Sequence, residues 1–264
     1  MKFAFMSFST PHLSLAETLS LAKCTGYDGI EPRVARNHAH GIELEASARQ
    51  RGEIRRQAED SGVSICCLAL STKFSLPEDA DDAVEECLEY VKLAHEIGCS
   101  RLRVFGGVFP AETSREQAID TMASSLSRVA GLAQSAQVHI CVETHDAWTH
   151  PDHVAAVMRQ VNHPSIAVNW DIMHPFRTSR VPMREAFETL RPWIRHVHTH
   201  DGTLADPLVL KPAGEGEIDV ATALHCLKEM EYTGFVSGEW IDCEMDLAEE
   251  IRRHRKLLYG APVS

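Results

Sequence analysis

Short runs of apolar residues alternate along the chain with longer segments in which apolar residues recur every three or four positions. The short runs predict strands buried on both faces, and the longer segments predict helices. The predicted strands cover residues 2–7, 29–32, 64–70, 101–105, 138–143, 166–171, 195–200 and 235–240. The predicted helices include residues 13–24, 44–61, 80–97, 115–134, 219–230 and 246–258.

The order of these elements predicts the fold. Gly26, Gly62, Gly98 and Gly234 each stand shortly before a predicted strand, where a glycine commonly ends a helix. Eight strands and eight helices in strict alternation predict parallel strands with right-handed crossovers. For an α/β chain of 264 residues the single (β/α)8 barrel, or TIM barrel, is the natural solution. An open doubly wound sheet is the alternative, but no Gly-x-Gly-x-x-Gly turn follows the first strand. No linker divides the chain, so we expect one domain over residues 1–264.

Four acidic or imidazole side chains stand near the ends of the last four predicted strands. They are Glu143, Asp171, His198 and Glu239. Barrel active sites form at the carboxyl ends of the strands, so we expect these side chains to meet. Carboxylates and imidazoles are the ligands that divalent Mn, Co, Zn, Mg or Fe accept. The alternative is four unrelated polar groups that cap loops, which is costly because a buried carboxylate needs a cation or a partner.

Two histidines follow these residues closely in the sequence. His174 stands three positions after Asp171, and it could bind substrate, take a proton, ligate a second metal or simply pack in its loop. His145 stands two positions after Glu143 and shares its direction if the strand continues. His145 could therefore reach the pocket or orient a metal ligand.

Three histidines alternate along the seventh predicted strand and so share one face. His196 is expected deeper in the barrel than His198, and His200 nearer the mouth. Glu31, at the end of the second predicted strand, could orient a substrate hydroxyl or pair with Arg33.

Two glycine-rich segments, Gly106-Gly107 and Gly214-Glu-Gly216, could hold a phosphate through backbone N–H groups, although glycine pairs are more often simple turns. Lys211, near the second segment, could contact an anionic or hydroxylated substrate, or could face solvent.

Composition narrows the possible partners and compartment. The formal net charge of −12 opposes binding to nucleic acid and gives no reason to expect an anionic membrane partner. No apolar run is long enough for a transmembrane helix, and the amino-terminal one is too short for a signal peptide. The eight cysteines include no Cys-x-x-Cys pair, which indicates free thiols in a reducing cytoplasm.

Together the strand-end motifs resemble the xylose isomerase-like barrel superfamily of sugar isomerases, epimerases and type IV endonucleases. The resemblance covers essentially the whole chain, from Gly26-Tyr-Asp-Gly-Ile-Glu to Gly234-Phe-Val-Ser-Gly-Glu-Trp. It implies a single divalent metal held by Glu143, Asp171, His198 and Glu239. The family's Asp-x-x-His pattern matches Asp171 and His174, and its Gly-x-Gly segment matches Gly214-Glu-Gly216. Many relatives carry lysine where this chain has His200.

The resemblance implies a metal-dependent isomerase or epimerase of carbohydrate metabolism, acting on a small sugar, a sugar phosphate or a related keto compound. The metal would polarise a carbonyl, and Glu143 or Glu239 would remove the neighbouring proton to give a metal-bound cis-enediolate. The other glutamate would return a proton. The expected substrate contacts are His174, His145, Glu31, Lys211 and His200. A homo-oligomer is an expectation from the family.

Three other functions remain open. A dehydratase or lyase of the 3-dehydroshikimate type would use the same metal and needs a cation for the substrate carboxylate, for which Arg33, Arg103 or Lys211 could serve. A type IV AP endonuclease-like nuclease needs extra histidines after the third and fourth strands, where Leu70-Ser-Thr-Lys-Phe and Phe105-Gly-Gly-Val supply none. A non-catalytic sugar-binding barrel would predict a broken ligand set, which the sequence does not have.

Overall fold

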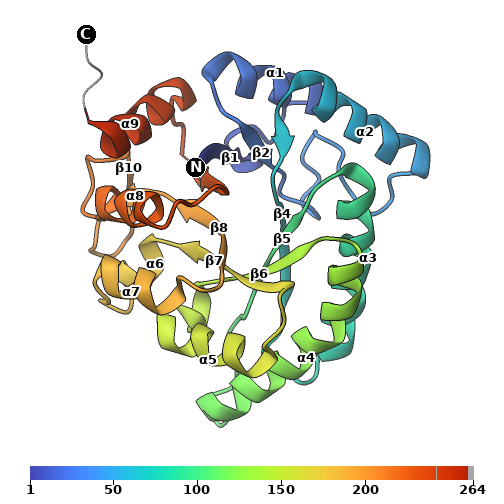
Figure 1. The fold of residues 1–264 in the computed structure, drawn as a ribbon, viewed down its shortest axis with the longest axis vertical. Coiled ribbons are helices and arrows are strands. Elements are labelled where there is room, and N and C mark those ends of the chain that lie inside the picture. The colour runs from blue at the N-terminus through green and yellow to red at the C-terminus, as the bar shows by residue number, and fades with distance from the viewer. Residues whose placement is uncertain (242, 261–264) are drawn as a thin grey trace.

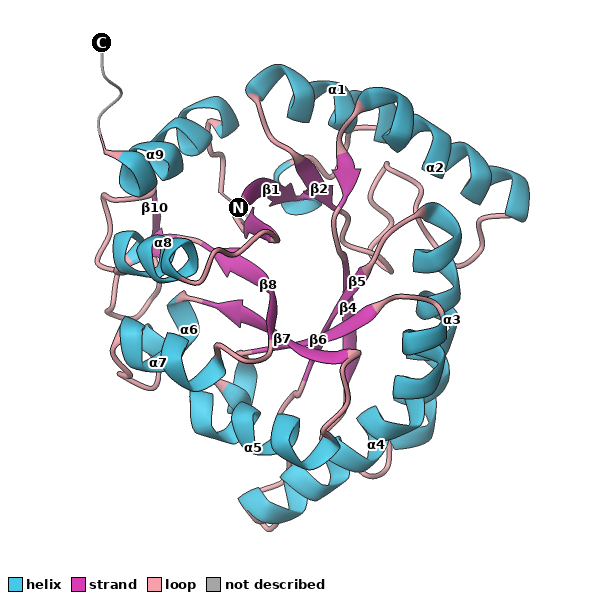
Figure 2. Ribbon diagram, viewed as in Figure 1, coloured by secondary structure: helices cyan, strands magenta, loops and turns pink. Residues whose placement is uncertain are grey.

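The strands form one parallel sheet that curves into a barrel, with the helices in a ring outside it (Figures 1 and 2). This computed structural model describes residues 1–241 and 243–260. Neighbours in the sheet follow the order β3-β2-β1-β11-β8-β7-β6-β5-β4. The bounds are β1 Lys2–Met6, β2 Gly29–Glu31, β3 Ser64–Ile65, β4 Leu68–Lys73, β5 Arg101–Phe105, β6 His139–Glu143, β7 Ile166–Asp171, β8 Ile194–Thr199 and β11 Phe235–Gly238. The predicted α/β barrel is confirmed.

The third predicted strand, residues 64–70, is in fact two strands. β3 pairs with β2, whereas β4 pairs with β5 and continues to Lys73. Cys66 and Cys67 lie between the two strands, where the chain leaves its pairing with β2 and begins its pairing with β5. A bridge between Arg33 and Ala69 spans the gap between β2 and β4, so the ring is nearly closed.

The helices begin and end largely where short-range signals predict. Their bounds are α1 Leu15–Thr25, α2 Ala48–Ser61, α3 Ala80–Ile97, α4 Arg115–Ser135, α5 Pro151–Val161, α6 Met173–Arg177, α7 Met183–Leu190, α8 Val220–Glu229 and α9 Leu247–Tyr259. Capping boxes at Ser14, Ser47 and Ser114 begin α1, α2 and α4, because serine and the residue three positions on bond to each other's backbone N–H. None of the helices in the described part of the chain combines the length and the apolar character that a membrane span requires.

Gly234 does not end α8, contrary to the sequence-based expectation. The helix ends at Glu229, and Gly234 lies against the ring of Tyr232, where an added Cβ would come 2.4 Å from the phenol oxygen. Close packing, rather than a helix end, therefore requires glycine at this position.

The loop after β8 forms a small hairpin that the sequence reading missed. Strand β9 (Asp201–Gly202) pairs antiparallel with β10 (Leu210–Lys211). β8 ends at Thr199 and β11 at Gly238, so His200 and Glu239 stand directly after strands, at the carboxyl-terminal mouth of the barrel.

Candidate functional site

The four side chains expected to meet at the mouth of the barrel do meet. Glu143, Asp171, His198 and Glu239 each place one ligand atom within 4.8 Å of the others, and all four are buried. They come from β6, β7, β8 and the residue after β11, which are consecutive neighbours in the sheet. Because parallel strands end at the same edge, residues that follow one another at intervals of 27 to 41 positions in the chain converge there.

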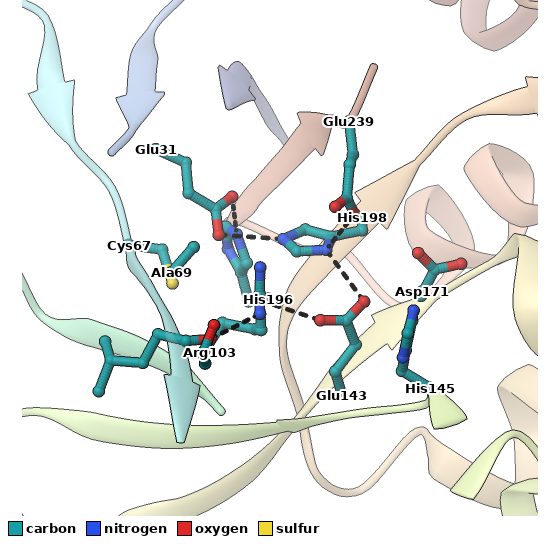
Figure 3. Close-up of polar contacts among 12 residues, drawn as sticks. Glu31, Cys67, Ala69, Arg103, Glu143, His145, Asp171, His196, His198 and Glu239 are labelled. Atoms are coloured by element: carbon teal, nitrogen blue, oxygen red, sulfur yellow. Dashed lines mark hydrogen bonds and ion pairs between the residues drawn. The ribbon is translucent and has the colours of Figure 1, made fainter. Parts of the chain in front are cut away.

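His198 lies at the centre of this cluster, as Figure 3 shows. Its Nδ1 is 3.1 Å from Glu239 Oε2 and 3.5 Å from Glu143 Oε1. Neither contact has the alignment of a hydrogen bond, so this buried nitrogen has no hydrogen-bond partner among the described residues. A buried ring nitrogen that faces two carboxylate oxygens is well placed to share a cation with them.

Asp171 is fixed by contacts on both of its oxygens. Oδ1 accepts hydrogen bonds from the backbone N–H groups of Met173 at 2.8 Å and His174 at 3.2 Å. Oδ2 lies 2.9 Å from His200 Nε2 and 4.0 Å from His174 Nε2. The start of α6 and the end of β8 therefore hold the carboxylate in place.

Glu143 forms a buried ion pair with Arg103. Arg103 Nε is 3.0 Å from Glu143 Oε2, both side chains are 1% exposed, and Arg103 Nη1 donates to the carbonyl of Leu70 at 2.7 Å. Burial alone would raise the pKa of Glu143, but the charges of Arg103 and His198 outweigh it and lower the pKa to about 2. Glu143 is therefore a weak base.

The charges around the cluster leave a deficit of two positive charges. Four buried carboxylates lie in the cluster or against its histidine, and the two buried guanidinium groups beside them supply only two positive charges. These groups are Glu31, Glu143, Asp171 and Glu239, with Arg33 and Arg103. One divalent cation, or two protonated imidazoles, would bring the balance to zero. Consistent with this, the pKa values of His198 and His200 are both raised: burial would lower them, but the neighbouring carboxylates together outweigh it, chiefly Glu31 at His198 and Asp171 at His200.

Three histidines form a row beside the cluster. The ring centroids of His145 and His174 are 4.3 Å apart, and those of His174 and His200 are 5.8 Å apart. His145 Nδ1 lies 2.8 Å from Asp146 Oδ1. Burial opposes protonation of His145, but the hydrogen bond with Asp146 and the charge of Glu143 raise its pKa to about 9. The expected substrate contacts His145, His174 and His200 therefore do lie next to the four-ligand cluster.

A cavity of about 640 Å³ lies beside this row and reaches it through His145. Phe105, whose ring centroid lies 4.9 Å from that of His145 with the planes tilted by 52°, forms part of its wall. Arg36 and Lys73 bring positive charge to the cavity, and acidic groups such as Glu86 bring negative charge. The sequence reading did not single out these three charged residues, because Arg36 comes from a loop, Lys73 from the end of β4 and Glu86 from α3.

Glu31 and Lys211 lie differently from the other expected substrate contacts. Both oxygens of the fully buried Glu31 contact histidines, His196 at 2.8 Å and His198 at 3.0 Å, which leaves neither oxygen free for a substrate hydroxyl. Its alternative partner, Arg33, donates instead to backbone carbonyls, including that of Ala69. Lys211 is exposed on β10, and its side chain makes no hydrogen bond or ion pair within the described residues.

The glycine segments have structural explanations. Asp201 Oδ2 accepts hydrogen bonds from the N–H groups of Gly214 at 2.9 Å and Gly216 at 3.0 Å, so these N–H groups already have an anionic partner. A Cβ on Gly216 would come 2.1 Å from Asp201 Oδ1, and one on Gly106 would come 2.1 Å from the Trp148 ring. Close approach therefore accounts for both glycines.

Comparison with known proteins identifies the family. A family model described as xylose isomerase-like TIM barrel matches residues 19–259. The chain belongs to this family. The xylose isomerase-like chain is 24% identical over 213 residues to 3-dehydroshikimate dehydratase of Bacillus anthracis, covering 79% of this chain and 74% of the relative. It is also 24% identical over 253 residues to L-ribulose-5-phosphate 3-epimerase UlaE of Salmonella typhi, covering 90% and 87%.

A solved structure carries the same fold. The crystal structure of the IOLI protein with a binding zinc atom superposes with a TM-score of 0.77 at 18% identity, covering 97% of this chain and 96% of that one. The xylose isomerase-like family thus includes a dehydratase and an epimerase among the relatives of this chain, and one protein of similar fold binds zinc.

Proposed function

We propose that the protein is a divalent-metal-dependent enzyme that moves a proton beside the carbonyl of a small polyhydroxylated substrate, as an isomerase or epimerase. One observation carries the proposal. Glu143 and Glu239 both reach His198 Nδ1, at 3.5 and 3.1 Å, yet come from β6 and from the end of β11, with β7 and β8 between them in the sheet. A substrate at the cluster would have a carboxylate on each side.

Glu143, Asp171, His198 and Glu239 would hold one divalent cation, in line with the deficit of two positive charges around them. Three carboxylates and one imidazole suit Mn²⁺, Co²⁺, Zn²⁺, Mg²⁺ or Fe²⁺. When bound, such a cation supplies Lewis acidity toward a carbonyl oxygen. The net charge of −12 supports a small-molecule substrate over nucleic acid.

The chain's own residues divide the proton transfers. Because Arg103 weakens Glu143 as a base, we assign removal of the proton next to the carbonyl to Glu239. The resulting enediolate would receive a proton from the opposite side, where Glu143 lies close to His145. His145, aligned by Asp146 at 2.8 Å, is placed to supply that proton.

A dehydratase is the second candidate, and the His145–Asp146 pair is the observation that favours it. An imidazolium oriented by a carboxylate at 2.8 Å is suited to protonate a departing hydroxyl after the first proton has been removed. The similarity to a dehydratase over 79% of the chain agrees with this candidate. The two reactions share their first step and differ in whether the carbon skeleton loses water.

The test is proton exchange by the metal-loaded protein in deuterated water. Metal content per chain is measured first, and we expect about one divalent ion. The protein is then offered ketoses, their phosphates and 3-dehydroshikimate, and products are analysed by NMR and mass spectrometry. Deuterium at the carbon beside the carbonyl without loss of water supports the isomerase or epimerase. Loss of water supports the dehydratase. No metal, and none taken up from Mn²⁺, Co²⁺ or Zn²⁺, would refute both.

Site variants assign the roles. Glu239→Gln should lower exchange at least 100-fold at saturating metal, and His145→Gln should lower water loss more than exchange if the dehydratase is correct. Glu250→Gln is the matched control, because Glu250 is also a buried carboxylate, 2% exposed, but lies on α9 outside the cluster. Equal activity of Glu239→Gln and the unaltered protein would contradict the assignment of the base.

A further inference from the structure

Glu31 is a buried carboxylate that contacts two histidines of one strand. It ends β2, is 0% exposed, and faces His196 and His198 of β8, which are also 0% exposed. Glu31 Oε2 is 2.8 Å from His196 Nε2, and Oε1 is 3.0 Å from His198 Nε2. Figure 3 shows the carboxylate between the two rings, on the far side of His198 from Glu143 and Glu239.

The arrangement follows from the alternation of side chains along β8. His196 and His198 are two residues apart and so point to the same face, toward the barrel interior. Their ring centroids are 5.4 Å apart with planes at 80°, so each ring turns its Nε2 to a different oxygen of Glu31. β1 and β11 lie between β2 and β8 in the sheet, so Glu31 reaches across the barrel interior.

These contacts determine which nitrogen of His198 is free. A carboxylate oxygen only accepts hydrogen bonds, so His198 must donate from Nε2 to Glu31. The neutral ring then carries its lone pair on Nδ1, the atom that faces Glu143 and Glu239. The buried carboxylate also makes the ring more electron-rich and so a better ligand.

We infer that Glu31, held in place by His196, is a positioning residue that fixes the tautomer and orientation of His198 for metal binding. The inference rests on the proposed function, because it requires that His198 Nδ1 ligates the metal. Glu31 touches no substrate: one oxygen contacts each histidine, and the His198 ring separates it from the cluster. This explains why an acidic residue at full burial lies so near three other carboxylates.

The test measures metal affinity directly. Purified metal-free protein is titrated with Mn²⁺ or Co²⁺ alone, with near-ultraviolet circular dichroism to confirm that each variant is folded. Glu31→Leu, which removes the acceptor for His198, should weaken binding about 10- to 100-fold. Glu31→Gln can still accept from His198 and donate to His196, whose Nδ1 makes no other hydrogen bond within the described residues, so it should weaken binding less. His196→Leu should weaken binding less, because Glu31 keeps its contact with His198.

Two further readouts separate a positioning role from a general loss of stability. Glu250→Gln, a substitution of another buried carboxylate, should leave metal affinity unchanged. In the zinc-loaded unaltered protein, NMR of the ring nitrogens should find the proton of His198 on Nε2. If the unaltered protein binds no divalent metal, the proposed function fails. If it binds metal and Glu31→Leu binds it equally well, or if His198 carries its proton on Nδ1, only the inference about Glu31 is overturned.

Discussion

Asp201→Asn should destabilise the protein through a network that lies beside the cluster. Asp201 is 1% exposed, and its carboxylate accepts four backbone hydrogen bonds. Oδ1 accepts from Gly202 at 2.8 Å and Ile218 at 3.0 Å, and Oδ2 accepts from Gly214 at 2.9 Å and Gly216 at 3.0 Å. Asparagine keeps only one accepting oxygen, so two N–H donors lose their partner and face an NH₂ group.

The size of the destabilisation depends on which pair of hydrogen bonds Asp201→Asn loses. The bonds from Gly202 and Ile218 are buried, whereas those from Gly214 and Gly216 are half-buried, so the asparagine oxygen should remain with the buried pair. Each donor left without a partner costs about 1–3 kcal/mol, and water can relieve part of this at the half-buried pair. We therefore expect Asp201→Asn to lower the free energy of unfolding by about 2–4 kcal/mol.

Urea unfolding followed by circular dichroism measures this difference, and hydrogen exchange should be faster at the amides of Gly214 and Gly216. Asp219→Asn is the control, because Asp219 is a nearby helix cap that accepts from Thr222 at 3.1 Å, and asparagine caps helices as well as aspartate. Its effect should be below about 0.5 kcal/mol. A loss under about 1 kcal/mol for Asp201→Asn would refute the reasoning about this network.

Three further predictions concern pH, helix stability and protons released by metal. Burial raises the pKa of Glu250 from 4.5 to about 7, so the folded state holds a proton that the unfolded state releases, and this stability is lost as pH rises from about 4.5 to 7. Glu250→Gln, which can still accept from the Ala213 N–H, should lack this pH dependence. In urea unfolding, the stability of the unaltered protein relative to the variant should therefore fall by up to about 3 kcal/mol between pH 5 and pH 8; the same pH profile in both proteins would contradict the prediction. Gly131→Ala, in open space on α4, should stabilise by about 0.5–1 kcal/mol in thermal unfolding, and a loss of stability would be the contrary result. Because the pKa values of His198 and His200 are raised, Mn²⁺ binding near neutral pH should release about one to two protons and weaken as pH falls. Calorimetry in buffers of different ionisation enthalpy measures the number of protons released. If binding releases no proton, the charge balance of the cluster is contradicted.

Most of the fold and the four-residue cluster could be predicted from the sequence, because both depend on short-range patterns and one rule of architecture. Periodicity separates strands from helices, and the carboxyl ends of parallel strands meet at one edge. That rule was enough to bring Glu143, Asp171, His198 and Glu239 together. His145 and His174 followed, since each lies within three residues of a member of the cluster.

The partners of the buried charges could not be predicted in the same way. The sequence offered Arg33 as a possible partner of Glu31, because the two stand two positions apart, whereas the structure pairs Glu31 with histidines 165 and 167 positions away. Arg103 carried a sequence signal, since it is a charged residue inside a predicted buried strand, but its pairing with Glu143 depends on β5 and β6 being neighbours.

The sequence by itself determined the alternation of elements, the helix caps at Ser14, Ser47 and Ser114, and the strand ends on which the cluster stands, because these depend on residues within a few positions of one another. Only the tertiary structure decided that β3 and β4 are separate strands, that Asp201 binds the Gly214–Gly216 segment, and which nitrogen of His198 faces the carboxylates. Side-chain alternation gives the face on which a residue lies, whereas its partner across the barrel depends on strand order, register and the depth at which each side chain ends.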